Sequence, residues 1–241
     1  MKSNNDPFGL AVSDYFNGNK KIHIEVETDL TEGEKIPVSK LFRTYKGMSD
    51  LEKKALDYCN GNILDIGACA GAHSLVLQKQ NKKVEALEIS PLACEVMKQR
   101  GVQKVINEDI FSFKSKKYDT LLLLMNGIGI CGTLEGLDKF LHHCKSILAP
   151  KGQIILDSTD ILYMYEDEDG SYWIDLNGAY YGELQYAIKY KDNFSEFKWL
   201  YIDFETLESH AVELGYKARK IYENDDNNFL AILTLHQPSE N

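Results

Sequence analysis

Short apolar runs alternate along this chain with segments in which apolar residues recur every three or four positions. The runs predict strands and the helical spacing predicts helices between them. The predicted strands cover residues 63–66, 83–89, 104–107, 118–125 and 153–157, and the predicted helices include 72–80, a segment beginning at Pro91, and 134–148. Pro150–Lys151–Gly152 predicts a turn between the last of these helices and the last strand. This alternation indicates a parallel sheet that binds ligands beyond the carboxyl ends of its strands.

A smaller region precedes this pattern. Residues 21–29 alternate apolar and polar positions, which predicts a half-buried strand, and Glu32–Gly33 predicts a hairpin turn after it. Residues 1–18 are polar with aromatic interruptions and indicate an arm or a short helix. Ser49 is a candidate N-cap for the next helix. We therefore expect an N-terminal arm and hairpin over residues 1–48 and the main domain over residues 49–241.

Residues 158–203 interrupt the alternation with tyrosines and tryptophans among glycines and acids. The pattern predicts antiparallel strands such as 183–190 and 199–202, inserted after the fifth strand. Such an insertion is either a lid or acceptor pocket, or a β-meander packed by its own aromatic residues. After it, we expect a helix over 204–214 and a strand pair at 217–222 and 228–235, which complete a seven-stranded sheet.

Composition narrows the class of protein. The formal net charge of −10 argues against a nonspecific nucleic-acid binder, which needs a basic face. The five cysteines are odd in number and form no CxxC motif, which predicts reduced thiols rather than disulfides or a metal site. The longest apolar run, Leu121–Met125, is too short to span a bilayer, and no signal-peptide core is evident. We expect a soluble cytoplasmic protein, with its oligomeric state open.

Polar residues end four successive predicted strands. Asp65, Glu88, Asp109 and Asn126 are separated by 23, 21 and 17 residues, about one strand–helix unit each. A carboxylate after the second strand can accept hydrogen bonds from both vicinal hydroxyls of a ribose. Asp109 can accept from an adenine amino group while Ile110 packs on the ring. Together with a glycine loop, these positions predict a nucleoside site.

The loop after the first of these strands reads Gly67-Ala68-Cys69-Ala70-Gly71-Ala72. A dinucleotide fingerprint requires glycine where Cys69 and Ala72 stand, so that the backbone can approach a pyrophosphate. S-Adenosylmethionine carries an amino-acid tail and a sulfonium instead, and its demands on the loop are smaller. The loop therefore favours S-adenosylmethionine over NAD, and an NAD-dependent oxidoreductase is the weaker alternative.

Five segments of the chain resemble class I S-adenosylmethionine-dependent methyltransferases. They are ILDIGACAG (63–71), ALEISP, NEDIF, MNG and ILAPKGQIILD. The resemblance implies an α/β, Rossmann-like, doubly wound and mostly parallel seven-stranded sheet with helices on both faces. It implies that the methionine part is held by Asp65, Gly67, Cys69 and Gly71, the ribose by Glu88, and the adenine by Ile89, Asp109 and Ile110. Asn126 would lie near the methionine ammonium and the acceptor, and Arg43 and Tyr45 could close over the methionine carboxylate. Cys69 departs from the family's glycine.

The resemblance also implies methyl transfer that yields S-adenosylhomocysteine. Positioning of the reactants can lower the barrier of such reactions by about 7–11 kcal/mol, so a catalytic acid or base is not obligatory. His73, at a predicted helix start, is a candidate general base, because that position favours its neutral form. It could equally be a polar helix-start residue, and Asn126 is a second catalytic candidate. We expect a methyltransferase for a small-molecule acceptor; a non-catalytic cofactor-binding protein of the same fold is the alternative.

Overall fold

Two compact units make up this protein. The computed structural model describes residues 6–114, 116–167, 169–175 and 178–236. The first unit comprises residues 1–113 and 185–197, and the second comprises 114–184 and 198–241. The ends of the expected regions, residues 1–5 and 237–241, lie outside the described residues, as do Glu168 and residues 176–177 of the expected insertion.

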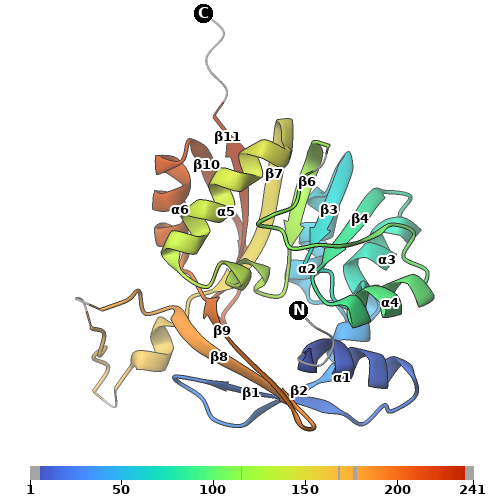
Figure 1. Ribbon diagram of the computed structural model, residues 1–241. Coiled ribbons are helices and arrows are strands. Elements are labelled where there is room, and N and C mark those ends of the chain that lie inside the picture. The colour runs from blue at the N-terminus through green and yellow to red at the C-terminus, as the bar shows by residue number, and fades with distance from the viewer. Residues whose placement is uncertain (1–5, 115, 168, 176–177, 237–241) are drawn as a thin grey trace, which may run out of the picture. The chain divides into compact units, whose positions relative to one another are not determined.

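The strands of a seven-stranded sheet are divided between the units (Figure 1). In the first unit, β4 pairs in parallel with both β3 and β5. In the second unit, β6 pairs in parallel with β7, and the antiparallel β11 and β10 follow in that order. The strands are β3 (Asn62–Ile66), β4 (Lys83–Glu88), β5 (Val105–Asn107), β6 (Tyr118–Leu123), β7 (Leu148–Thr159), β10 (Tyr216–Glu223) and β11 (Asn228–Leu235). The predicted Rossmann-like fold is confirmed.

Helices of the first unit begin at residues that favour helix starts. In α2 (Asp50–Tyr58), the Ser49 side chain accepts from the Glu52 backbone N–H, and the Glu52 side chain accepts from that of Ser49. This reciprocal capping box satisfies two backbone donors that would lack partners inside the helix. The helix α4 (Pro91–Gln99) has proline at its first position and Ser90 as its N-cap. Between them lies α3 (Ala72–Lys79).

The second unit carries α5 (Leu134–Ile147) and α6 (Phe204–Glu213). His210 on α6 lies 2.7 Å from Asp138 on α5, measured from Nδ1 to Oδ1, which joins the two helices. Short 3-10 segments, η4 (Gly127–Cys131) and η5 (Leu162–Tyr165), follow β6 and β7. No helix among the described residues is long and apolar enough to span a membrane.

The predicted turn at residues 150–152 is wrong as a separate element. The strand β7 begins at Leu148 and runs through these residues to Thr159. Lys151 adopts a left-handed conformation with φ of 67°, and the pairing with β6 shifts register there, from Tyr118↔Leu148 to Thr120↔Gln153. The turn residues therefore form an irregularity inside a longer strand, because hydrogen bonding resumes on both sides of it.

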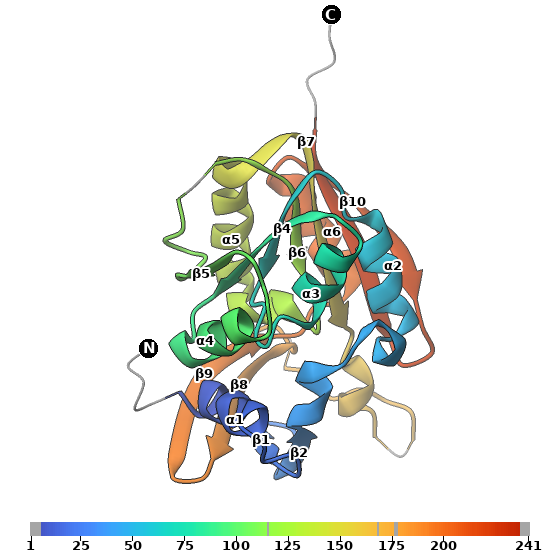
Figure 2. The same ribbon diagram turned by 90° about the vertical axis from the view of Figure 1, so that its right-hand side faces the viewer.

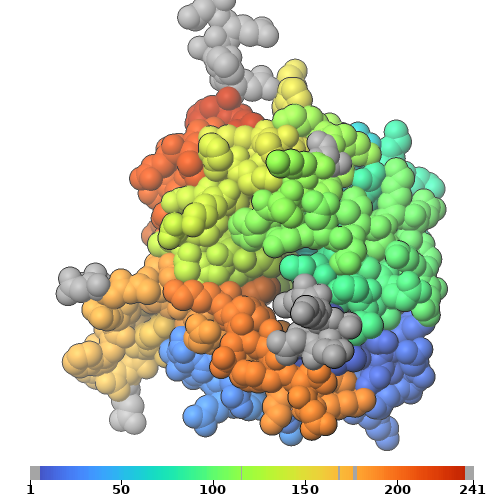
Figure 3. Space-filling model, in the orientation of Figure 1, coloured from blue at the N-terminus to red at the C-terminus, as the bar shows by residue number. Residues whose placement is uncertain are grey.

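The N-terminal region contains α1 (Pro7–Phe16) and the antiparallel pair β1 (His23–Thr28) and β2 (Glu34–Pro37). The strands β8 (Glu183–Tyr190) and β9 (Asn193–Leu200) join this pair in a four-stranded sheet of order β2-β1-β8-β9. In Figure 3 the orange residues of this hairpin lie against the blue N-terminal residues. The insertion therefore pairs with the N-terminal hairpin, and β9 begins six residues before the strand predicted at 199–202.

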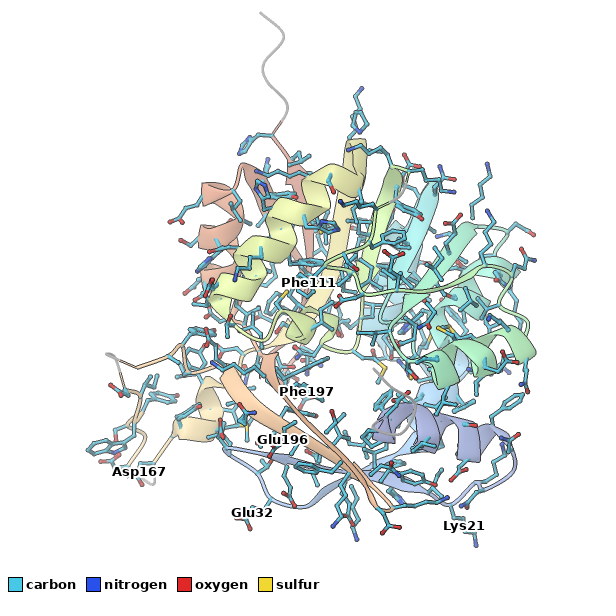
Figure 4. All side chains as sticks on the ribbon, in the orientation of Figure 1. Lys21, Glu32, Phe111, Asp167, Glu196 and Phe197 are labelled. Carbon is cyan, nitrogen blue, oxygen red and sulfur yellow. The ribbon has the colours of Figure 1, made fainter. Side chains whose placement is uncertain are left out.

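A hydrophobic cluster holds this region together. It contains Val12 of α1, Ile24 and Val26 of β1, Ile188 of β8 and Val96 of α4. In Figures 1 and 2, α1 lies between α4 and β1. Neighbouring residues of β9, labelled in Figure 4, differ in burial. Glu196 is exposed, whereas Phe197 is partly buried and stacks on Tyr186 with ring centroids 5.6 Å apart.

Candidate cofactor site

The glycine loop between β3 and α3 turns sharply. Gly67, Cys69 and Gly71 all have positive φ angles, of 70°, 52° and 77°. A Cβ atom added at Gly71 would lie 2.8 Å from Cγ2 of Val102, so glycine is required there by packing. A Cβ atom at Gly67 would meet nothing within 4 Å. The loop thus packs tightly at Gly71 and borders open space at Gly67.

Glu88, the last residue of β4, is held by backbone donors. Its side chain accepts from the Cys69 N–H at 2.8 Å and from the Ser90 N–H at 2.9 Å, one on each carboxylate oxygen. Burial raises the pKa of Glu88, and these two hydrogen bonds act in the opposite direction. Each carboxylate oxygen retains a further lone pair. The carboxylate is therefore fixed in place while it can still accept from two ligand hydroxyls.

Asp65, the corresponding acid of β3, is nearly inaccessible, with 2% of its surface exposed. Its carboxylate accepts from the Ser74 hydroxyl at 2.6 Å, and burial raises the pKa of Asp65. This contact attaches the first turn of α3 to the end of β3. Asp65 therefore stabilises the glycine loop by joining the strand before it to the helix after it.

The segment after β5 presents two residues expected at the adenine. Asp109 is exposed, and its Oδ1 accepts from the Phe111 N–H at 2.9 Å. Ile110 is 6% exposed, so its side chain is buried, whereas Ile89 and Phe111 are 42% and 40% exposed. The accessible apolar side chains are thus Ile89 and Phe111, which is labelled in Figure 4. Sequence reasoning missed Phe111 although it follows Ile110 directly.

Asn107 is a further residue that the sequence did not single out. Its Nδ2 donates to the carbonyl oxygens of Glu88 at 2.8 Å and Ile89 at 2.9 Å. The side chain therefore fixes the backbone that carries both predicted ligand contacts. Its only sequence signal is its place as the last residue of β5.

Arg43, Glu52 and His73 form a buried network. The Arg43 guanidinium pairs with the Glu52 carboxylate, and Nε2 of His73 lies 2.8 Å from Oε1 of the same group. The side chains of these three residues are 11%, 10% and 9% exposed. Burial alone would raise the pKa of Glu52, but hydrogen bonds from His73, Arg43 and Ser49 lower it to about 2. Glu52 is therefore ionised and links three segments of the first unit.

This network bears on the predicted role of His73 as a general base. Nε2 of His73 lies 2.8 Å from the ionised Glu52 carboxylate, which only accepts hydrogen bonds, and 3.3 Å from Nη2 of Arg43, which only donates. The shorter contact assigns the proton to Nε2, which donates it to Glu52. Nδ1 is then the nitrogen that could accept a proton from a substrate. The general-base role stays a prediction, and the contacts of Nε2 favour the alternative of a helix-start residue bound to its neighbours.

Tyr45 and Arg100 also belong to the first unit. Tyr45 belongs to the 3-10 segment η3 (Tyr45–Gly47) and is 40% exposed. Arg100, which sequence reasoning missed, donates to the Ala70 carbonyl oxygen inside the glycine loop. Its guanidinium carbon lies 4.6 Å from the centroid of the Phe42 ring. Arg100 therefore holds the loop through its backbone.

Asn126 lies in the second unit, at the end of β6. It and Met125 have positive φ angles of 54° and 64°, which is unusual for two adjacent residues other than glycine. The Asn126 side chain donates from Nδ2 to the Leu200 carbonyl at 3.2 Å and accepts at Oδ1 from Ser158 at 2.9 Å. It thereby joins the ends of β6, β7 and β9. Its catalytic and cofactor-binding roles stay predictions.

The Cys69 side chain lies in a hydrophobic environment. The side chain packs against the hydrophobic cluster that contains Ala11 and Val12 of α1. Burial raises the pKa of the Cys69 thiol well above its ordinary value, so the thiol stays protonated. Its contribution to the site is the backbone N–H that Glu88 accepts. A cysteine is thus compatible with the loop.

Replacing Cys69 with glycine should leave the affinity for S-adenosylhomocysteine within about twofold of wild type, because the backbone donor is retained. Glycine relieves the strain of the left-handed backbone conformation, which costs roughly 1 kcal/mol. It also removes a buried apolar side chain, whose burial stabilises the fold by a comparable free energy, so thermal stability should change little. Titration calorimetry and thermal unfolding measure the two quantities. A loss of affinity of tenfold or more would mean that the Cys69 side chain itself contributes to cofactor binding.

Comparison with known proteins places this geometry in a family. A family model described as a methyltransferase domain matches residues 64–156. The solved structure of an S-adenosylmethionine-dependent methyltransferase from Bacteroides fragilis, in complex with S-adenosyl-L-homocysteine, is 41% identical and has a TM-score of 0.92. The match covers 98% of each chain. The S-adenosyl-L-homocysteine bound in that relative agrees with the predicted cofactor.

More distant relatives share the fold alone. The CcbJ methyltransferase from Streptomyces caelestis has a TM-score of 0.64 at 8% identity, over 96% of this chain and 98% of that one. An amino pentose methyltransferase from Micromonospora echinaspora has a TM-score of 0.54 at 15% identity, over 79% and 93%.

A curated relative matches over a shorter stretch. An rRNA adenine N-6-methyltransferase from Limosilactobacillus reuteri is 39% identical over 62 residues, which are 24% of this chain. That stretch spans 25% of the relative's own length. The similarity to the Bacteroides fragilis enzyme, in contrast, extends over nearly the whole of both chains. This chain therefore belongs to the S-adenosylmethionine-dependent methyltransferases.

Proposed function

We propose that this protein transfers the methyl group of S-adenosylmethionine to a nucleophilic atom of a small-molecule acceptor. The observation that carries the proposal is the Glu88 carboxylate, buried at the carboxyl end of β4 and fixed by backbone donors from the glycine loop and from Ser90. A fixed acceptor of this kind suits the two hydroxyls of a ribose.

The residues of the first unit fit an adenosyl ligand. Glu88 would hold the ribose, Asp109 would accept from the adenine amino group, and the exposed Ile89 would pack on the ring. The open space beside Gly67 leaves room for the methionine part along the loop. When bound, the cofactor supplies an electrophilic methyl group on a sulfonium. The chain's own residues bind and orient, and no proton transfer is assigned to any of them.

Arg43 is the residue that we propose for the methionine carboxylate. Its guanidinium is anchored by Glu52 and also donates from Nη1 to the Lys40 carbonyl at 2.5 Å. Guanidinium groups suit carboxylates because both are planar and can form paired hydrogen bonds. Anchoring by Glu52 would reduce the entropy lost when a ligand is bound.

The acceptor class rests on charge. With a formal net charge of −10, the chain lacks the basic excess by which proteins attract phosphate backbones, in spite of its short match to an rRNA methyltransferase. Aromatic side chains in residues 163–199 suit a small, partly apolar acceptor. Five free cysteines, four of them buried, favour a reducing compartment, so we place the reaction in the cytoplasm.

The test is methyl transfer from S-adenosylmethionine labelled on the methyl group. The protein is incubated with a panel of small amines, alcohols and thiols, and in parallel with total RNA. We expect label in small-molecule products, with formation of S-adenosylhomocysteine. Label in RNA alone would overturn the acceptor class. Cofactor binding without transfer to any acceptor would support the non-catalytic alternative, and absence of cofactor binding would refute the proposal as a whole.

A further inference from the structure

Two helix starts in the first unit share one hydrogen bond. Asp6 caps α1, with Oδ1 accepting from the Gly9 N–H at 2.7 Å. Ser90 caps α4, with Oγ accepting from the Ala93 N–H at 3.0 Å. The Ser90 hydroxyl then donates to Oδ2 of Asp6 at 2.5 Å. Both residues are buried, at 1% and 4% exposure, so this contact is shielded from water.

The approach of the two helices depends on Gly9. A Cβ atom added there would lie 2.2 Å from Oδ2 of Asp6 and 2.2 Å from Oγ of Ser90, a distance that no packing tolerates. Around this contact, Val12 of α1 lies in the same hydrophobic cluster as Ala93 and Val96 of α4. The cluster and the polar contact together dock α1 on the start of α4.

The same docking reaches Glu88 through Ser90. The Ser90 backbone N–H donates to one Glu88 oxygen while the Ser90 hydroxyl binds Asp6. One of the two backbone donors to Glu88 therefore belongs to the residue that joins α1 to α4. Displacing α1 would free this residue to move.

We propose that Asp6 and Ser90 are positioning residues for cofactor binding. They dock α1 so that Glu88 is held where a ribose can bind, and α1 docking and cofactor binding stabilise each other. The coupling is reciprocal by linkage, since whatever strengthens one equilibrium strengthens the other to the same degree. This inference rests on the proposed function, because it assigns the ribose to Glu88. It adds that α1, which precedes the methyltransferase motifs in the sequence, is part of the cofactor site.

Two variants disturb the docking without touching Glu88. Asp6→Ala removes the acceptor of the Ser90 hydroxyl but leaves Ser90 as the cap of α4. Gly9→Ala leaves every polar group and inserts a methyl group at the contact. We expect each to weaken S-adenosylhomocysteine binding by about tenfold in titration calorimetry, within the usual range of coupling between sites. Thr133→Ala is the matched control, because it removes the cap of α5, whose Oγ1 accepts from the Gly136 N–H at 3.0 Å, and should leave the affinity unchanged.

Hydrogen exchange in the wild-type protein gives an independent readout. Saturating S-adenosylhomocysteine should slow amide exchange in α1, and Asp6→Ala should reduce that protection. A purely structural contact would lower thermal stability without changing affinity or ligand-dependent exchange. The inference is overturned if Glu88→Ala weakens binding whereas Asp6→Ala and Gly9→Ala do not, and if amide exchange in α1 is the same with and without ligand. That result would leave the assignment of the cofactor site to Glu88 intact. If Glu88→Ala has no effect either, the assignment of the ribose to Glu88 fails first.

Discussion

S-Adenosylhomocysteine should bind about 100-fold more weakly when Glu88 is replaced by alanine. The carboxylate would accept from two ribose hydroxyls, and hydrogen bonds to a charged group contribute about 1.5 kcal/mol or more each. Their loss corresponds to about 3 kcal/mol, and each tenfold change in affinity corresponds to about 1.4 kcal/mol. The substitution also leaves the Cys69 and Ser90 N–H groups without their acceptor, which loosens the loop. Titration calorimetry measures the affinity.

Glu85→Ala is the matched control for this experiment. Glu85 lies on the same strand, three residues earlier, and pairs with Lys104 at 3.1 Å. Its removal from β4 should leave the affinity for S-adenosylhomocysteine within about twofold of wild type, since ion pairs with an exposed partner contribute little. Equal affinities of wild type and Glu88→Ala, with both proteins folded, would show that the ribose is bound elsewhere.

Replacing Glu52 with glutamine should lower the free energy of unfolding by about 3–5 kcal/mol at pH 7. The carboxylate is the shared partner of Arg43 and His73, and removing one member of a buried pair leaves the other charge uncompensated. Glutamine keeps the size of the side chain, so the effect reports charge and hydrogen bonding rather than a cavity. Urea denaturation measures the difference.

The difference should depend on pH with a definite sign. The pKa of Glu52 is about 2 in the folded protein and 4.5 ordinarily. The unfolded chain therefore binds a proton first as the pH falls, and the stabilisation from this group is full above about pH 5 and lost toward pH 2. One pKa unit corresponds to about 1.4 kcal/mol, so ionisation of Glu52 contributes about 3 kcal/mol to the free energy of unfolding. Wild type and Glu52→Gln should converge in stability as the pH is lowered through this window.

Asp50→Asn controls for charge at the same helix start. Asp50 is the first residue of α2, but its side chain is 82% exposed and pairs only at the surface, with Lys53 at 3.2 Å. Its replacement should change stability by less than about 1 kcal/mol. A small and pH-independent effect of Glu52→Gln, similar to that of Asp50→Asn, would mean that the buried network contributes no net stability.

Local sequence determined the elements around the site and the acids that end them. Strands β3 and β4 follow from short apolar runs, and α2 and α4 from capping residues and Pro91, because strand and helix signals involve residues only a few positions apart. Glu88 and Asp109 could be singled out as candidates because parallel strands place their carboxyl ends at one edge of a sheet. The family resemblance and the cofactor followed from the same motifs.

Only the tertiary structure decided the partners of these residues. Arg43, Glu52 and His73 lie 9 and 21 residues apart along the chain, and Asp6 bonds Ser90 across 84 residues. The insertion strand β8 pairs with β1, far from it in sequence. Cys69 stands where the family has glycine, yet its side chain packs against the hydrophobic cluster that contains residues of α1. Such contacts depend on where the whole chain places its surfaces, since burial and charge pairing act between neighbours in space and leave no periodicity along the sequence.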